Sequence, residues 1–528
     1  MKIVKNKWVS VILLTIILLL FLRIDFRFKY DVECCSDDYD YYLHASTIVF
    51  DFDLDYSNQD VRDFSYFKND KTTPIGFIGS GILSSPFLFL GSQISNFLGE
   101  ETQKELLNFQ FLFYSLSSVI YFFFSYILIY KTMTLLGVKL KKSHILLFFA
   151  GSGLPYYAFE RFSMTHVYEA FTISLLIYYL VKYYFNFEKK ENIYAAFIPA
   201  ILLISFLTRM SNFYIFLIPT IVYKLLIKEK YKIQNKLFHN KFFQISTVLC
   251  LFLYNRLVNI LYGEFIINPQ RIYGDTRKAS DYIGSNQEII NSVIDLISTG
   301  VTVLFSWEFG IFWVSPILFI GVLACIYKLK DLKSIESIFI LFCFGQNFFI
   351  IFLWQTAASS YGYRYLFSLV PLSFFIIFMV FQQNEIVNKY LYSFSIFSIL
   401  SILFFETTEL TQLSVEDQLN SFGTLIRYVE PEYVKGVVLS FLQLNSYLII
   451  FTTSFVGAIS FKFLISLFGI DKLILFLTKA GLPVDNQDFQ TYLLNLKIIG
   501  IEKFIFILLL FSYISYYIIY KIEDKNIK

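Results

Sequence analysis

Carboxylate side chains are crowded into one polar stretch near the start of this 528-residue chain. Six aspartates occur there, namely Asp37, Asp38, Asp40, Asp51, Asp53 and Asp55. A carboxylate can take a proton from an acceptor hydroxyl group, or it can hold a divalent cation. The stretch is therefore either a catalytic or cation-binding site, or a solvated acidic loop with no chemistry of its own.

Basic side chains that could complement these carboxylates occur at other polar breaks in the sequence. They are Lys71, Arg161, Arg209, Arg271 and Arg364. The planar guanidinium group of arginine matches the oxygens of a phosphate, so carboxylates and arginines on one face suit a reaction with a phosphate leaving group. An arginine at a helix end, such as Arg209, can instead be an anchor whose charge reaches the membrane interface.

Two of the four histidines, His44 and His166, fall in the same kind of polar segment. His166 follows Glu160 and Arg161 in a short break between two apolar runs. Its position near a predicted helix start favours either a polar cap that faces water or a contact with substrate.

The elements that must position these side chains are membrane-spanning helices. The chain is 56% hydrophobic and 16% charged, whereas soluble domains are about 25% charged. Apolar runs of about 18 residues recur along it, and each can cross a bilayer core of about 30 Å. These runs are continuous and do not alternate, which indicates helices and not barrel strands. We expect an all-α polytopic membrane protein, with the bilayer as a partner and without a basic tract for nucleic acid.

The N-terminus is expected on the cytoplasmic side, because Lys2, Lys5 and Lys7 precede the first apolar run. The acidic stretch then lies in a first outer loop, 24–106. The apolar part of that loop, 76–98, predicts a pair of short interfacial helices, with one more transmembrane helix as the alternative. The protein is expected in the cytoplasmic (inner) membrane, with its active site on the outer, periplasmic face.

Alternation of basic loops predicts about 12 to 14 spans in total. After the first, they are expected near 107–130, 144–159, 166–185, 193–207, 212–227, 243–262, 301–327, 335–354, 366–382, 390–405, 437–458 and 503–520, and the segment 463–478 is either a span or an interfacial helix. Residues 263–300 form a second outer loop and 406–436 a third. We expect a catalytic transmembrane module over 1–405, followed by a C-terminal outer loop and further transmembrane segments over 406–528.

The acidic stretch resembles a known pattern. Ser36-Asp-Asp-Tyr-Asp-Tyr-Tyr42 followed by Asp51-Phe-Asp-Leu-Asp-Tyr-Ser-Asn58 is similar to the first outer loop of bacterial integral-membrane glycosyltransferases of the GT-C superfamily. Met164-Thr-His166 and Tyr361-Gly-Tyr-Arg364-Tyr resemble later turns of the same family, in the same order. More distant relatives in that superfamily are protein O-mannosyltransferases and lipid A aminoarabinose transferases. The resemblance covers roughly residues 1–380.

The resemblance implies about a dozen transmembrane helices with short helices on the outer leaflet. It also implies a polyprenyl-phosphate-linked sugar donor, transfer with inversion, and a lipid, glycan or protein acceptor in cell-envelope polysaccharide chemistry. A first-loop aspartate would be the general base or would position a divalent metal such as Mg or Mn. By motif position that residue is Asp37, with Asp38 and Asp40 as neighbouring candidates. Residues expected near the donor phosphate are Arg364, Arg209, Arg271 and Lys71, and substrate contacts are expected from His166, Glu160, Tyr41 and Tyr42.

Two other classes share part of this pattern. Polymerases and ligases of surface polysaccharide also have many spans and outer-loop arginines, but those arginines lie mainly in a large late loop. Transporters usually place ionisable residues or broken helices near the middle of the membrane. Here the charges gather at predicted outer helix ends, which favours the glycosyltransferase interpretation.

Overall fold

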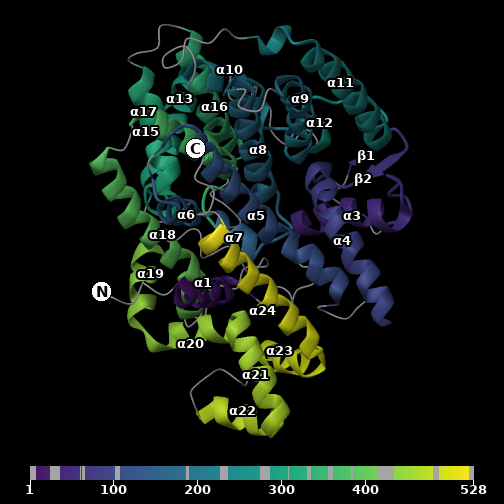
Figure 1. The fold of residues 1–528 in the computed structure, drawn as a ribbon, viewed down its shortest axis with the longest axis vertical. Coiled ribbons are helices and arrows are strands. Elements are labelled where there is room, and N and C mark those ends of the chain that lie inside the picture. Colours follow the sequence, from purple (N-terminus) through teal and green to yellow (C-terminus); the bar gives the residue numbers. More distant parts are fainter. Residues whose placement is uncertain are drawn as a thin grey trace.

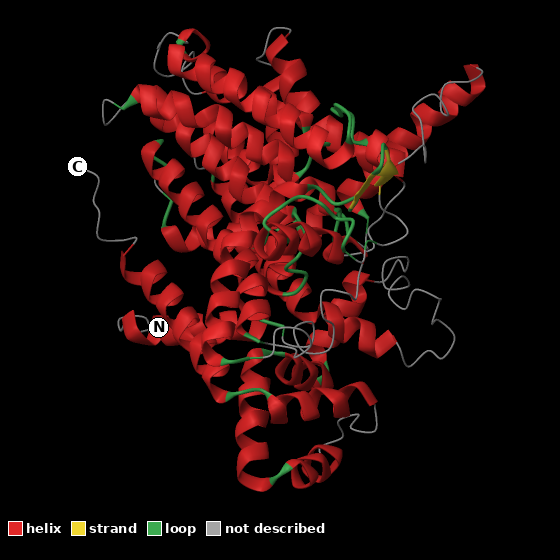
Figure 2. Cartoon of the chain, turned by 90° about the vertical axis from the view of Figure 1, so that its right-hand side faces the viewer, coloured by secondary structure: helices red, strands yellow, loops and turns green. Residues whose placement is uncertain are grey.

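The computed structural model describes most of the chain. The described ranges are 7–23, 36–59, 61, 66–100, 108–138, 140–185, 190–225, 236–273, 286–306, 309–329, 335–354, 361–381, 384–412, 433–479 and 487–521. Almost all of this part is helical (Figure 2). The third predicted outer loop falls largely outside it, as do Cys34 and Cys35.

Five of the described helices are long and apolar enough to cross a membrane. They are α5 (Phe109–Leu135), α9 (Glu191–Thr208), α11 (Lys241–Tyr262), the first part of α18 (Glu385–Gln412), and α24 (Ile501–Tyr516), which continues into the π-helix η10 (Tyr517–Lys521). Seven shorter apolar helices accompany them, including α1 (Lys7–Phe21) and α21 (Phe455–Phe468). The protein is therefore an all-α polytopic membrane protein, as the apolar runs predicted.

The following helices include the other five of these seven shorter apolar helices and several that are more polar. They are α8 (His166–Phe185), η4 (Phe213–Leu217), α10 (Ile218–Tyr223), η6 (Leu237–His239), α12 (Gln270–Tyr273), α13 (Asn286–Phe305), α14 (Ile311–Val314), α15 (Pro316–Leu329), α16 (Ile335–Trp354), η8 (Arg364–Leu369), α17 (Val370–Val380), α19 (Tyr433–Leu442), α20 (Leu444–Thr453), α22 (Ile470–Lys479) and α23 (Gln487–Ile498). The predicted second outer loop, 263–300, thus contains α12 and most of α13. The predicted boundary at 405 falls inside α18.

The first loop is built from two helices and a hairpin. The short helix α3 (Ser36–Ser46) continues into a π-helical turn, η3 (Thr47–Asp51), and α4 (Ile78–Leu98) packs against both. The predicted pair of short helices over 76–98 is wrong, because α4 is one helix of 21 residues that continues through Pro86. Between them lies a hairpin that the sequence analysis missed, made of β1 (Tyr66–Lys68) and β2 (Lys71–Thr73).

A predicted single span, 144–159, is two helices, α6 (Lys142–Ala150) and α7 (Leu154–Phe159). The break lies at Gly151–Gly153, where Gly153 has φ +88°, a conformation that glycine adopts without strain. A Cβ at Gly153 would lie 2.5 Å from the ring of Phe367. The predicted span 301–327 is likewise broken, into the end of α13, α14 and α15.

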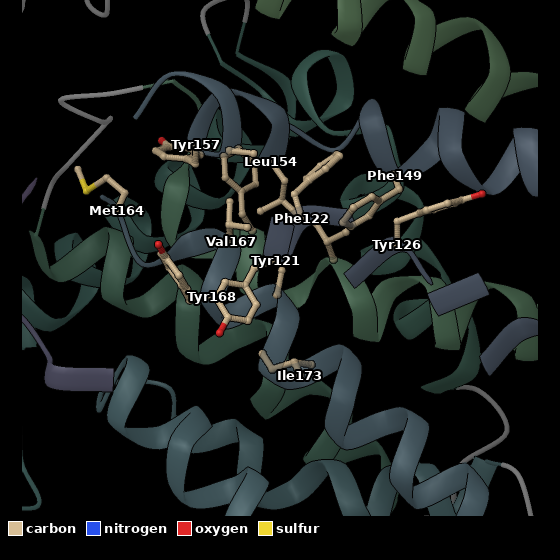
Figure 3. Close-up of a cluster of buried hydrophobic side chains, with 14 of the residues drawn as sticks. Tyr121, Phe122, Tyr126, Phe149, Leu154, Tyr157, Met164, Val167, Tyr168 and Ile173 are labelled. Carbon is tan, nitrogen blue, oxygen red and sulfur yellow. The ribbon is translucent and has the colours of Figure 1, made fainter. Parts of the chain in front are cut away.

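Helix α8 lies at the centre of the molecule. It packs against α5 and α9, and also against α17 and η8 (Figure 1). Aromatic rings fill the space around it, among them Tyr121, Phe122, Phe149, Tyr157 and Tyr168 (Figure 3). Helix α24 packs on α1, so the C-terminal region contacts the first helix of the chain.

Candidate functional site

Three aspartates at the start of α3 point to three different partners. Asp37 and Asp38 lie in the first helical turn, where the positive end of the helix dipole favours carboxylates. Asp37 pairs with Arg364, and Asp38 pairs with Arg161. Asp40 accepts a hydrogen bond of 3.3 Å from the backbone N–H of Gly76. Asp37 and Asp38 are consecutive residues of the helix and therefore point in different directions.

The pair of Asp38 and Arg161 is buried and doubly bonded. The Nε and Nη2 atoms of Arg161 donate to one carboxylate oxygen of Asp38 at 3.1 Å and 2.5 Å. The two side chains are only 12% and 11% exposed. Burial raises the pKa of Asp38 above its usual value, and Arg161 opposes that shift. Ser163 also donates to the Asp38 carbonyl oxygen. This pair therefore attaches α3 to the turn that follows α7.

In the pair of Asp37 and Arg364, the carboxylate is much more exposed to solvent than the carboxylate of Asp38 is. The Nη1 atom of Arg364 lies 3.3 Å from an oxygen of Asp37, whose side chain is 48% exposed. The Arg364 side chain is only 12% exposed, and its Nε atom is buried without a hydrogen-bond partner in the described part of the chain. Asp37 is thus the carboxylate of α3 that solvent, or a substrate, can reach most easily.

A second guanidinium lies beside the first. Arg209, at the extended residue that ends α9, lies 5.0 Å from the ring centre of Tyr365, and Arg364 lies 5.5 Å from the same ring. Cations over an aromatic face are attracted by its quadrupole, so Tyr365 holds both arginines near each other. Two arginines that are distant in sequence thereby converge beside α3.

Glu169 is the centre of a buried polar network that includes Arg209. One of its oxygens accepts from Arg209 Nε at 2.8 Å and from the Thr165 hydroxyl at 2.7 Å, and the other accepts from the Asn212 amide at 2.7 Å. Arg209 Nη2 also donates to the Thr165 hydroxyl, at 2.7 Å. The Glu169 side chain is 1% exposed. The network joins the start of α8 to the end of α9.

His166 begins α8 inside the same region. Its ring packs on Tyr157 with centroids 4.5 Å apart, and its Nδ1 atom lies 3.4 Å from Glu169. Neither ring nitrogen has a hydrogen-bond partner within the described residues, although the side chain is fully buried. The structure thus places His166 beside the arginine network, where the sequence predicted a substrate contact.

Tyr41 lies near charged groups of both signs. Burial raises the pKa of its hydroxyl above the usual range, and the charged groups that act on it include Arg209, Asp37 and Arg364. Tyr42 points elsewhere, because its ring packs edge-on against Tyr114, with centroids 5.1 Å apart. The structure therefore brings together Asp37, Tyr41, His166, Arg209 and Arg364 from the predicted set.

Other predicted residues lie in different surroundings. Glu160 is buried and lines a small pocket with Arg23, between the end of α1, α7 and α18. Arg271 is 62% exposed and lies 3.8 Å from Glu264. Lys71 belongs to strand β2 and lies next to Gly263. The roles of these three side chains in substrate binding stay predictions.

Two residues that shape the site were not predicted as site residues. Arg161 was one of several basic residues that could complement the carboxylates, but it stands directly after Glu160, so the choice between the two neighbours could not be made from sequence. Glu169 lies three residues after His166, which places both on one face of a helix. That spacing was the available signal for Glu169.

The three aspartates do not form a metal centre by themselves. Within the described residues, no group of three or more His, Cys, Asp or Glu side chains is placed to hold a metal ion. Asp37 and Asp38 face guanidinium groups, and Asp40 faces a backbone N–H. A divalent metal at Asp37 stays a prediction, and the geometry of these donors does not favour it.

Comparisons with known proteins give no family for the chain. No protein-family model and no curated protein matches it. Two solved structures are similar, the Archaeoglobus fulgidus oligosaccharyltransferase in the apo form and archaeal oligosaccharyltransferase AglB, also from Archaeoglobus fulgidus, in complex with an inhibitory peptide and a dolichol-phosphate. Their identities are 12% and 14%, with TM-scores of 0.38 and 0.36. They match 83% and 82% of this chain, which spans 56% and 55% of theirs. Similarity at this level carries no argument about the site.

Proposed function

We propose that this protein is a membrane glycosyltransferase that moves a sugar from a polyprenyl-phosphate donor to an acceptor hydroxyl group. The observation that carries the proposal is the half-exposed carboxylate of Asp37 beside two arginines gathered on Tyr365. An exposed base next to a buried cationic pair is what a transfer with a phosphate leaving group requires. The motif resemblance supports the same class of reaction.

The general base in this proposal is Asp37. Asp38 is bonded twice by Arg161, and Asp40 is buried against Gly76. Only the Asp37 carboxylate combines exposure with a single long contact among these three. When the donor phosphate reaches Arg364, the Asp37 carboxylate is free to turn toward the acceptor.

The chemical step follows from these positions. The acceptor O–H gives its proton to Asp37, and the oxygen lone pair forms the new bond to the anomeric carbon. The bond between that carbon and the phosphate oxygen breaks, and its electron pair leaves on the phosphate. Arg364 and Arg209 neutralise the charge that develops there. Attack on the side opposite the leaving group inverts the anomeric configuration.

In this proposal the site lies on the outer face of the cytoplasmic membrane, with the N-terminus inside. The donor reaches the site sideways from the outer leaflet, because a polyprenyl chain stays in the bilayer. The acceptor is a lipid, a glycan or a protein. The rival class, a polysaccharide polymerase or ligase, uses arginines without an aspartate base, so a test of Asp37 distinguishes the two.

The decisive experiment is a transfer assay with the full-length protein in nanodiscs and a panel of polyprenyl-phosphate sugars. We expect Asp37→Asn and Arg364→Lys to lower transfer at least about a hundredfold, the lower end of general acid–base contributions. The melting temperature of Asp37→Asn should stay near wild type, because a half-exposed ion pair contributes about 0–1 kcal/mol.

A matched control is the exposed Asp53 in the same loop, whose carboxylate accepts a hydrogen bond of 3.0 Å from the backbone N–H of Asp55. Asp53→Asn should transfer sugar like wild type. Wild-type transfer by Asp37→Asn would remove the base assignment. Absence of transfer by the wild-type protein with every donor would refute the proposed reaction class.

A further inference from the structure

Glu169, which is not one of the predicted site residues, holds one of the site's two arginines, Arg209, in place. Glu169 receives hydrogen bonds from Arg209, Thr165 and Asn212, all between 2.7 Å and 2.8 Å. These donors come from the start of α8 and from the segment that follows α9. A carboxylate bonded from two elements fixes both the position and the plane of the guanidinium it accepts from.

The bonds to Arg209 leave little rotational freedom. Its Nε and Nη2 atoms point to Glu169 and Thr165, and its guanidinium carbon lies 5.0 Å from the centre of the Tyr365 ring. Arg364 contacts the same ring. The orientation of Arg209 relative to Arg364 is therefore set by its hydrogen bond to Glu169 and by its contact with the Tyr365 ring.

The ion pairs of Asp37 with Arg364 and of Glu169 with Arg209 differ in the exposure of the carboxylate. The Asp37 carboxylate is 48% exposed, whereas Glu169 is 1% exposed and fully bonded. A buried carboxylate with this many donors does not leave its arginine when an anion arrives, because it would lose every bond at once. Glu169 is thus a permanent partner of Arg209, and Asp37 is an exchangeable partner of Arg364.

We infer that Glu169 is a positioning residue for the donor phosphate, acting through the orientation of Arg209. This inference rests on the proposed function, since it assumes that Arg209 and Arg364 bind that phosphate. Glu169 itself need not touch the donor. Its removal should weaken phosphate binding to Arg209 while leaving Arg364 and Asp37 in place.

The test uses binding, which does not depend on turnover. The probe is polyprenyl monophosphate added to the full-length protein in nanodiscs. We expect Glu169→Gln to weaken probe binding about tenfold, because a hydrogen bond to a charged group is worth about 1.5–3 kcal/mol and 1.4 kcal/mol is a factor of ten. In an Arg209→Ala background, Glu169→Gln should cause no further loss of affinity, although it should still lower the melting temperature.

Glu100 offers a matched control far from the arginines in sequence. It too is a poorly exposed carboxylate with three donors, namely Lys503 at 2.7 Å, the Phe109 N–H at 2.9 Å and the Ser95 hydroxyl at 2.8 Å. Glu100→Gln should lower the melting temperature and leave probe affinity per folded protein unchanged. This control separates a loss of stability from a loss of positioning.

The outcomes distinguish a failure of the positioning role of Glu169 from a failure of the proposed function. If Arg364→Lys weakens probe binding and Glu169→Gln does not, the positioning role is refuted and the proposed function stands. Additive losses in the double variant of Glu169 and Arg209 would also refute it. If the wild-type protein does not bind the probe, the proposed function and this inference are both refuted.

Discussion

The three aspartates near the start of α3 have different surroundings, and these surroundings decide which of them can serve as a general base. The motif position favoured Asp37, and Asp38 and Asp40 stayed as neighbouring candidates. The partners of the three carboxylates lie in other segments of the chain, so no local pattern could show how their surroundings differ. Burial and the number of donors now separate a structural pair, Asp38 with Arg161, from an open one, Asp37 with Arg364.

His44 shows how the same helix is attached on its buried side. Its Nε2 atom donates to the carbonyl oxygen of Gly76 at 2.6 Å, so its Nδ1 atom accepts from the Tyr56 hydroxyl at 2.5 Å. The ring is fully buried. Burial favours the neutral imidazole, in which Nδ1 is an acceptor, and the two bonds connect α3 to the loops on either side of the hairpin.

Stability should consequently fall in mild acid. Burial lowers the pKa of His44 to about 4, from 6.5. Below pH 6.5 the unfolded chain binds a proton at this position that the folded protein does not, so stability decreases as the pH falls from 6.5 toward 4. At 1.36 kcal/mol per pKa unit, the full loss is about 3 kcal/mol.

The melting temperature measured between pH 7.5 and 4.5 tests this prediction. His44→Gln keeps a donor for Gly76 and cannot titrate, so its curve should be flatter than that of wild type. The exposed His239 is the control, and His239→Gln should follow the wild-type curve. Parallel curves for wild type and His44→Gln would contradict the role given to His44.

At the scale of elements, glycines allow α4 to approach the helices that carry the site. A Cβ at Gly81 would lie 2.5 Å from the Cβ of His44 in α3. A Cβ at Gly79 would lie 2.2 Å from the backbone nitrogen of Thr208, directly before Arg209. Helix α4 therefore supports both the aspartates and one arginine, which its apolar composition did not reveal.

The variant Gly79→Ala should displace the end of α9 relative to α4. Because the clash is with backbone and not with a flexible side chain, we expect a loss of about 3 kcal/mol, at the upper end of the cost of overpacking. Affinity for polyprenyl monophosphate should fall as well, since Arg209 moves with Thr208. Thermal melting and probe binding in nanodiscs measure the two effects.

Gly345 in α16 is the matched control, because, apart from its chain neighbours and its own helix backbone, no atom of the described residues lies within 4 Å of the position of its Cβ. Gly345→Ala should keep or slightly raise the melting temperature. Alanine is more favourable than glycine inside a helix by about 0.5–1 kcal/mol. Equal melting temperatures for the two alanine variants would show that α4 and α9 are not packed as closely as the structure indicates.

At the scale of the whole molecule, the sequence predicted what local physics determines. Run length and apolarity predicted the helices, and the polar breaks predicted where charges would gather. The breaks at Gly151–Gly153 and before Pro316 were missed, because each depends on packing against a distant segment, such as Phe367 against Gly153. The convergence of Arg209 and Arg364 on Tyr365 depends on tertiary structure in the same way.

We predict the orientation of the site across the membrane from α8, which is long enough to span a bilayer although it is not among the five most apolar long helices. This helix begins at His166, next to the arginines, and ends at Phe185, shortly before Lys190. With 20 residues and a rise of 1.5 Å per residue, it is about 30 Å long, which matches the hydrocarbon core of a bilayer. Lysines after its end favour the cytoplasm there, so its first turn should face the outer side.

Cysteine labelling in intact cells tests that orientation. In a background where Cys34, Cys35 and Cys250 are serine, Ser57→Cys should react with a membrane-impermeant maleimide, because Ser57 is exposed in the loop that follows α3. Lys190→Cys, exposed beyond the end of α8, should react only after the cells are opened. Labelling of both positions from outside would mean that α8 does not cross the bilayer. The reverse pattern would place the aspartates and arginines in the cytoplasm, where a donor in the outer leaflet cannot reach them.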